Sequence, residues 1–128
     1  MIDSTPSVNQ YFQNTLWVPG HFHTYMALGV MLFVIGAVYH ILPYLTGIVS
    51  DERIAKRALT FILIGGYGFV LSFLSQGALG NPRRYTYALR NLDWIAWLGV
   101  FFAGMAAYGT LLIFNDIGLK LVRIILSP

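Results

Sequence analysis

The chain has 128 residues, and its composition is that of a protein that spans a membrane. Hydrophobic residues make up 57 % of it and charged residues only 10 %, whereas an ordinary soluble domain carries about a quarter charged residues. The absence of cysteine excludes disulfides and thiolate metal sites. The net charge of +3 comes from a few loop and tail residues and does not suggest nucleic-acid binding.

The first predicted transmembrane helix runs from about residue 17 to 42. Pro19 is tolerated in its first turn, and Pro43 is expected to close its far end. A helix of roughly 25 residues is long enough to cross a hydrocarbon core of about 30 Å with some tilt.

Two histidines near the start of this helix, His21 and His23, are placed to contact two separate partners. Side chains at i and i+2 of an α-helix point about 200° apart, so the two rings leave nearly opposite faces. They are badly placed to hold one small ion together, and imidazole is a usual axial ligand of haem iron. The hypothesis is one helix wedged between two haems. The ordinary alternative is an interfacial histidine that reaches water, as we expect for His40.

The second predicted helix runs from about residue 54 to 79. The preceding Ser50-Asp51-Glu52 supplies a capping oxygen and acids for the first turn. Gly80-Asn81-Pro82 is a strong stop signal.

The third predicted helix runs from about residue 93 to 114, with Asn91 or Asp93 as its cap. The segment 115–118 is expected to weaken the helix, and residues 119–126 are expected to form a short amphipathic tail. Small residues recur every four positions and would let another helix approach closely; they are Gly99, Ala103 and Ala107. The predicted fold class is therefore an all-α membrane protein with three transmembrane helices.

Antiparallel packing would bring the histidines to the same membrane side as an arginine pair, Arg83 and Arg84. Guanidinium groups bind carboxylates bidentately and stay charged, so this pair could hold haem propionates. Two arginines that reach the interface at a helix end are the alternative. The positive-inside rule places the histidine end outside, because five basic residues on the opposite side outnumber three here. The five are Arg53, Lys56, Arg57, Lys120 and Arg123, and the three are Arg83, Arg84 and Arg90.

These residues resemble a known family. Residues 14–23, NTLWVPGHFH, look like the two-haem-ligand segment of subunit I of the haem-copper oxygen reductases. Residues 80–85, GNPRRY, look like the propionate-binding arginine pair of that family. The spacing and the intervening helix match as well, so the resemblance covers nearly the whole chain. The WVPGHFH form is most similar to the B-type branch, which is found in archaea and thermophilic bacteria.

The resemblance implies a role for each of these residues. His21 would be the proximal ligand of the high-spin haem, and His23 would ligate the low-spin haem that passes electrons to it. Arg83 and Arg84 would hold the haem propionates, and no residue is implied in acid–base catalysis. The implied reaction is the reduction of dioxygen to water, coupled to proton translocation.

The resemblance also implies that residues 1–128 form the C-terminal part of a larger helical bundle. The copper ligands and the second low-spin haem ligand are expected on the missing N-terminal part, so the isolated chain is not expected to be catalytic. The other implied partners are oxidase subunit II, membrane lipid and an electron donor, which would be cytochrome c, a blue-copper protein or quinol. The implied location is the plasma membrane of an archaeon or bacterium, crossed several times by the chain.

Three positions depart from the family pattern. Asn9 and Gln13 stand where the family often has an aspartate and a histidine, and Asn14 stands where many members have a further aspartate. Amides exchange hydrogen bonds but cannot load a proton or bind a metal strongly. These residues do not reproduce the proton-exit site of the family.

Two further hypotheses remain open. A subunit similar to the nitric oxide reductases would keep the two-haem helix, with non-haem iron and nitric oxide turnover as its signs. An inactive, truncated membrane scaffold would have merely interfacial His21 and His23, and its purified complex would show no haem absorbance.

Overall fold

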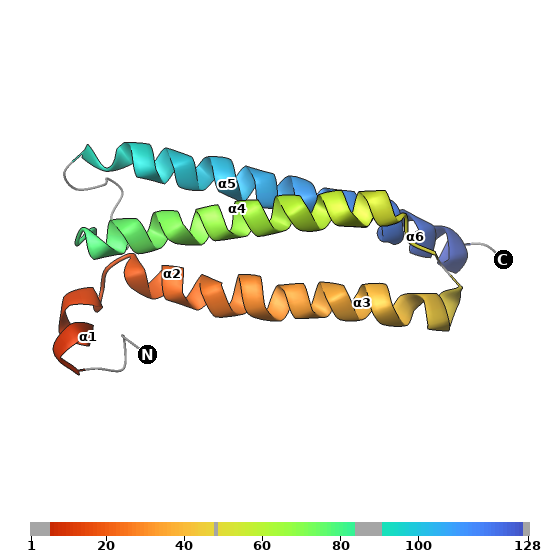
Figure 1. The fold of residues 1–128 in the computed structure, drawn as a ribbon, viewed down its shortest axis with the longest axis horizontal. Helices are drawn as coiled ribbons and strands as arrows, with labels where there is room; N and C mark the ends of the chain where they lie inside the picture. Colours follow the sequence, from red (N-terminus) through yellow and green to blue (C-terminus); the bar gives the residue numbers. More distant parts are fainter. Residues whose placement is uncertain (1–5, 48, 84–90, 127–128) are drawn as a thin grey trace.

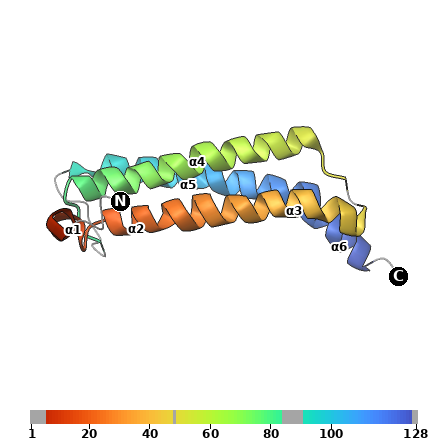
Figure 2. The same ribbon diagram turned by 60° about the horizontal axis from the view of Figure 1, so that its bottom comes forward.

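The computed structural model describes residues 6–47, 49–83 and 91–126, and these residues form an all-α protein. Its helices assemble into three long rods that run side by side (Figures 1 and 2). The described residues contain three helical stretches long and apolar enough to cross a membrane, which are Trp17–Thr46, Glu52–Ala78 and Asp93–Leu126. The elements are α1 (Pro6–Phe12), α2 (Trp17–His23), the π-helix η2 (Thr24–Val30), α3 (Met31–Thr46), α4 (Glu52–Ala78), α5 (Asp93–Ile113), the π-helix η4 (Phe114–Gly118) and α6 (Leu119–Leu126).

Helix α4 packs closely on α5 and also contacts α2. A Cβ atom added to Gly65 of α4 would lie 2.5 Å from the backbone nitrogen of Ala106, and one added to Gly109 of α5 would lie 2.7 Å from the carbonyl oxygen of Ala58. The packed face of α5 therefore follows the spacing 95, 99, 102, 106 and 109. The predicted stripe is right at Gly99, which is buried, but Ala107 is exposed. A regular spacing of four drifts around a helix of 3.6 residues per turn, whereas alternating steps of four and three stay on one face.

Glycines also bring the start of the first rod against the end of α4. A Cβ atom added to Gly77 would collide with the backbone of Trp17, and one added to Gly20 would lie 3.0 Å from the side chains of Phe73 and Leu74. Farther along, the buried Leu28 lies over Gly66. The α2–α4 contact therefore depends on the absence of side chains, and it fixes the position of the histidine helix.

The first rod ends later than the sequence predicted. Pro43 lies inside α3, and the helix continues to Thr46. Proline removes one backbone donor, but its carbonyl oxygen still accepts a hydrogen bond from the Gly47 N–H at 3.0 Å. Gly47, at φ +69°, provides the left-handed residue that ends the helix.

The prediction for the cap of α4 is confirmed, and the one for α5 is wrong. Asp51 is the N-cap of α4, and its carboxylate accepts hydrogen bonds from the Arg53 and Ile54 N–H groups at 2.8 and 3.3 Å. The N-cap of α5 is Leu92, whose side chain has no oxygen. Asn91 does not cap because it adopts a left-handed backbone, at φ +56°, one residue too early. Residues 114–118 do not break the third rod, which passes through them as a π-helix into α6.

A buried carboxylate joins all three rods at the end opposite the histidines. Asp116, only 1 % exposed, accepts hydrogen bonds from Lys120 Nζ at 2.8 Å and from the Asp51 backbone N–H at 3.0 Å. The Tyr39 hydroxyl donates to its other oxygen at 3.4 Å. Lys120 Nζ also donates to the Val49 carbonyl oxygen at 3.0 Å. This network holds the connection between α3 and α4 against the third rod.

Candidate functional site

The two histidines of α2 have different surroundings, as their spacing predicted. His23 lies against α4. Its ring centroid is 6.0 Å from that of Phe73, on which it stacks, and 5.5 Å from that of Phe69, which it meets edge-on. The ring of His21 instead meets Tyr25 of its own rod edge-on, at 4.9 Å. Both histidines are half-buried. One imidazole thus lies against the neighbouring helix, and the other packs along its own rod.

The ring of His23 is oriented by its own helix. Its Nδ1 lies 2.7 Å from the carbonyl oxygen of Pro19, one turn earlier. Because a carbonyl oxygen can only accept, Nδ1 is the donor in this bond, and Nε2 is the nitrogen that could bind a metal. A histidine that ligates a metal usually donates its other ring N–H to a carboxylate, carbonyl or water in this way. The sequence did not identify this partner, although the spacing of four residues is the signal that could have done so.

The backbone turns into a π-helix directly after His23. The Thr24 hydroxyl donates to the Gly20 carbonyl oxygen at 3.0 Å, and the π-helix η2 continues to Val30. Such wide turns are rare and occur frequently at functional sites. No pattern in the sequence predicted it.

A short antiparallel contact connects the segment before α2 to the segment after α4. Thr15 and Pro82 form an isolated β-bridge. The Leu16 N–H donates to the Asn81 carbonyl oxygen, and the Arg83 N–H donates to the Asn14 carbonyl oxygen, both at 2.9 Å. The histidine helix and Arg83 therefore lie at the same end of the bundle, as the antiparallel arrangement predicted.

The side chain of Arg83 is fixed by one of these neighbours. Its Nε donates to Oδ1 of Asn14 at 2.9 Å, across a sequence separation of 69 residues. This bond uses one of the five guanidinium N–H donors. Arg84, the second arginine of the predicted pair, lies outside the described residues.

Buried amides support this end of α4. Asn81 Nδ2 donates to Gln76 Oε1 at 2.8 Å, and the Asn81 N–H donates to the Gln76 carbonyl oxygen at 2.9 Å. These residues are only 3 % and 5 % exposed. Since buried amides need partners, this pair fixes the turn that leads to Arg83. The sequence pattern indicated Asn81 only as part of a stop signal.

The described residues supply single donor groups at this end of the bundle. Within the described ranges, no group of three or more His, Cys, Asp or Glu side chains could hold a metal ion. Haem needs only axial ligands from the protein, and the His23 tautomer offers one. The guanidinium of Arg83 at the same end is suited to a carboxylate.

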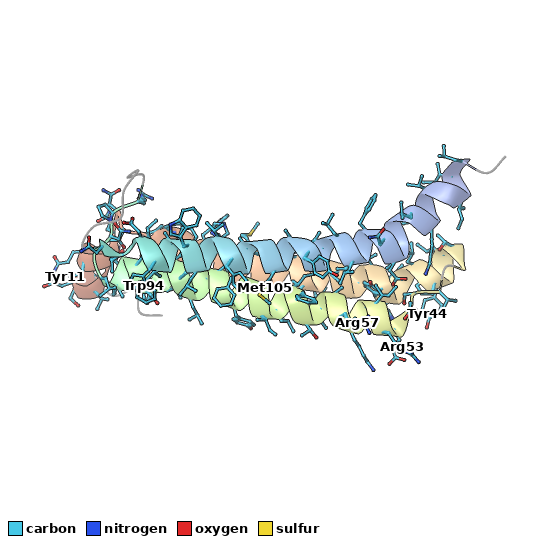
Figure 3. All side chains as sticks on the ribbon, turned by 90° about the horizontal axis from the view of Figure 1, so that it is seen from above. Tyr11, Tyr44, Arg53, Arg57, Trp94 and Met105 are labelled. Atoms are coloured by element: carbon cyan, nitrogen blue, oxygen red, sulfur yellow. The ribbon has the colours of Figure 1, made fainter. Side chains whose placement is uncertain are left out.

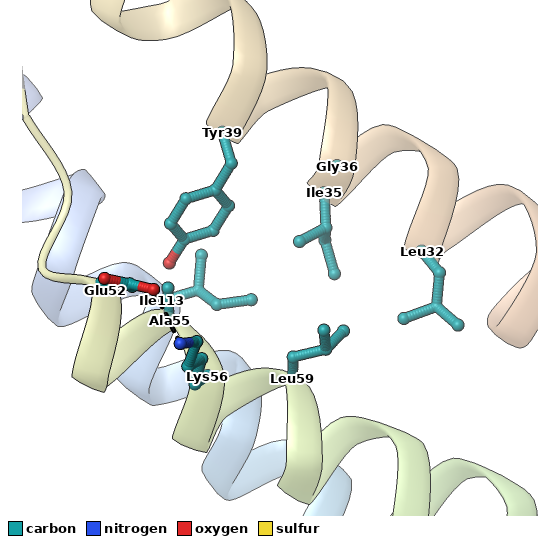
Figure 4. Close-up of a pocket in the computed structure, with 9 residues that line it drawn as sticks. All are labelled: Leu32, Ile35, Gly36, Tyr39, Glu52, Ala55, Lys56, Leu59 and Ile113. Atoms are coloured by element: carbon teal, nitrogen blue, oxygen red, sulfur yellow. Dashed lines mark ion pairs between the residues drawn. The ribbon is translucent and has the colours of Figure 1, made fainter.

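The structure also has a cavity that does not involve these residues. It measures about 370 Å³ and lies between α3 and α4, with the Glu52–Lys56 ion pair at one side (Figure 4). Its lining is mostly apolar and belongs to the end opposite the histidines. Arg53 and Arg57 extend from α4 at that same end, away from Tyr11 and Trp94 (Figure 3). The cavity therefore does not mark the candidate site.

Comparison with known proteins gives consistent matches. The family model described as "Cytochrome C and Quinol oxidase polypeptide I" matches residues 1–111. The chain is 35 % identical over 109 residues to a "Heme-copper oxidase subunit I+III" of Aeropyrum pernix, which covers 80 % of this chain and 13 % of that protein. It is 30 % identical over 87 residues to a "Cytochrome c oxidase subunit 1" of Thermus thermophilus, covering 66 % and 16 % respectively. It is also 30 % identical over 112 residues to a "Probable cytochrome c oxidase subunit 1-alpha" of Streptomyces coelicolor, covering 83 % and 19 %. No solved structure matches the chain significantly.

The chain therefore belongs to the cytochrome c and quinol oxidase polypeptide I family. This confirms the resemblance to subunit I of the haem-copper oxidases and the multi-pass membrane fold. The chain spans less than a fifth of the length of the relatives named above.

Proposed function

We propose that this chain is the haem-ligating, C-terminal part of a terminal oxidase subunit I. The observation that supports it best is the surroundings of α2. His21 and His23 have different neighbours, and Arg83 is held at the same end of the bundle. His23 is the proposed ligand of the low-spin haem iron, and His21 that of the high-spin haem iron. Arg83 and Arg84 are the proposed partners of the haem propionates.

The residues of the chain would orient and hold these groups. The Pro19 carbonyl oxygen holds the Nδ1–H of His23 and so orients the ring, which leaves Nε2 as the nitrogen that would ligate a metal. Phe73 and Phe69 restrict the rotation of that ring. When bound, the two haems would supply the iron centres for electron transfer and dioxygen reduction. Phe22, between the two histidines, keeps the path through the helix short.

The proposed reaction is electron transfer from the low-spin to the high-spin haem and reduction of dioxygen to water, with proton translocation. The remaining part of subunit I would supply the copper ligands, and subunit II, membrane lipid and an electron donor would complete the complex. The donor would be cytochrome c, a blue-copper protein or quinol. The basic residues at the α4 start support an orientation with the haem-ligand end outside a bacterial or archaeal plasma membrane. The affiliation with the B-type branch rests on the WVPGHFH form.

Substitution of each histidine in the assembled complex tests this proposal. His23→Ala should remove the low-spin absorbance band and leave the membrane helices folded. His21→Ala should remove the carbon monoxide difference spectrum of the high-spin haem and retain the low-spin band. His40→Ala, on α3, is the matched control and should change neither. A His23→Ala complex with an unchanged spectrum would refute the assignment.

A further inference from the structure

We infer that Asn14 is a positioning residue for the Arg83 guanidinium: it directs the terminal N–H groups toward a haem propionate without neutralising the arginine charge. This inference rests on the proposed function, because it assumes that Arg83 meets a propionate. It concerns a position at which the sequence departs from the family pattern.

The contact is a double attachment. Asn14 receives the Arg83 backbone N–H at its carbonyl oxygen and the Arg83 Nε–H at its side-chain oxygen, both at 2.9 Å. The first bond fixes where the arginine leaves the chain, and the second fixes the direction of its side chain. A carboxylate can bind a guanidinium through Nε and one terminal nitrogen or through both terminal nitrogens. Because Nε is engaged, the end with both terminal nitrogens is the one presented to a carboxylate.

The backbone conformation at position 14 limits which residue types can occupy it. Its φ of +67° is a left-handed conformation that glycine, asparagine and aspartate adopt readily and other residues adopt at a cost. Among these three, only asparagine offers an acceptor oxygen without a negative charge. Aspartate would offer the same oxygen but would form an ion pair with Arg83, and glycine would offer no side chain.

The difference in charge has an electrostatic consequence. A carboxylate at position 14 would compensate the guanidinium charge, whereas an amide leaves the full positive charge for the propionate. A nearby positive charge disfavours the oxidised haem, which is more positive than the reduced haem. Asn14 should therefore keep the midpoint potential of the haem next to Arg83 higher than aspartate would.

The experiment is a double-mutant cycle in the purified complex, with redox titration of the haem bands as the readout. Arg83→Gln should lower one midpoint potential. Asn14→Gly, which accepts the same φ, should lower that potential when Arg83 is present and leave it unchanged in the Arg83→Gln background. Asn14→Asp should retain the haem and lower the potential more than Asn91→Asp. Asn91 is a matched control because it also has a left-handed backbone, at φ +56°.

The outcomes separate the inference from the function on which it rests. If Arg83→Gln shifts a potential but Asn14→Gly does not, Asn14 has no positioning role and the propionate assignment stands. An equal effect of Asn14→Gly in both backgrounds also overturns the role. If Arg83→Gln leaves both potentials unchanged, the propionate assignment fails and the role of Asn14 fails with it. If the Asn14→Gly complex loses its haem, the midpoint potentials of Asn14→Asp and Asn91→Asp are compared instead. Equal shifts of the potential in these two variants would overturn the inference.

Discussion

Gly77 of α4 and Trp17 of α2 touch through their backbones, and a single methyl group on Gly77 would collide with Trp17. Trp17 is the first residue of α2, and His23 is the last. The contact therefore sets how close the histidine helix lies to α4 and where the His23 ring meets Phe73.

Gly77→Ala should destabilise the complex, because the new methyl group must push α2 away from α4. Overpacking of this kind typically costs about 1–3 kcal/mol. We expect a lower melting temperature when unfolding is monitored through the low-spin absorbance band. Gly104→Ala is the control, since a Cβ atom there meets nothing within 4 Å, and alanine favours the helix. A melting temperature unchanged by Gly77→Ala would show that the two helices are not in backbone contact.

Two ion pairs of identical spacing should differ in their effect on stability because they differ in burial. The side chain of Asp116 is 0 % exposed in its pair with Lys120, whereas that of Glu52 is 80 % exposed in its pair with Lys56. Asp116→Asn weakens a buried acceptor of several hydrogen bonds and should cost about 1–3 kcal/mol. Glu52→Gln should cost less than about 0.5 kcal/mol. Thermal unfolding of the purified complex measures both, and equal losses would contradict the network.

Phe73→Leu should loosen the His23 ring without removing its hydrogen bond. Leucine lacks the flat face on which the imidazole stacks, so the ring samples more orientations. We expect the low-spin haem to remain bound and its electron paramagnetic resonance signal to broaden. Phe101→Leu, at a side chain that is 61 % exposed, should leave the signal sharp. Equal line widths in the two variants would show that Phe73 does not restrict the His23 ring.

Pro19→Ala should leave the low-spin spectrum unchanged. The group that orients His23 is a backbone carbonyl, which alanine also provides, and an additional N–H in the first turn of a helix is harmless. Loss of the band in this variant would mean that the proline ring, rather than the carbonyl, positions the histidine. The absorbance spectrum of the purified variant is sufficient to decide.

Local features of this structure could be predicted from sequence, and distant contacts could not. The Asp51 cap and the stop at Gly80 depend on residues within one or two turns, so the pattern revealed both. The prediction failed at Pro43, because α3 continues past the proline, whose own carbonyl oxygen still accepts the Gly47 N–H. It failed for Asn91, because a left-handed φ cannot be read from residue type.

The contacts between residues distant in sequence could not be predicted for a different reason. Asn14 and Arg83 are 69 residues apart, and Tyr39 and Asp116 are 77 apart. Periodicity places such residues on a helix face or at one membrane side, but it does not state which side chains meet. The prediction that the histidine helix and Arg83 lie at the same end of the bundle is confirmed, because antiparallel neighbours bring the start of one helix beside the end of the next.

A density map of the assembled complex tests the central proposal most directly, because it shows what lies next to each imidazole of α2. We expect one iron porphyrin bonded to His23 and a second bonded to His21, with a propionate beside Arg83. A map that places either ring against lipid or water, with no porphyrin within bonding reach, would contradict it.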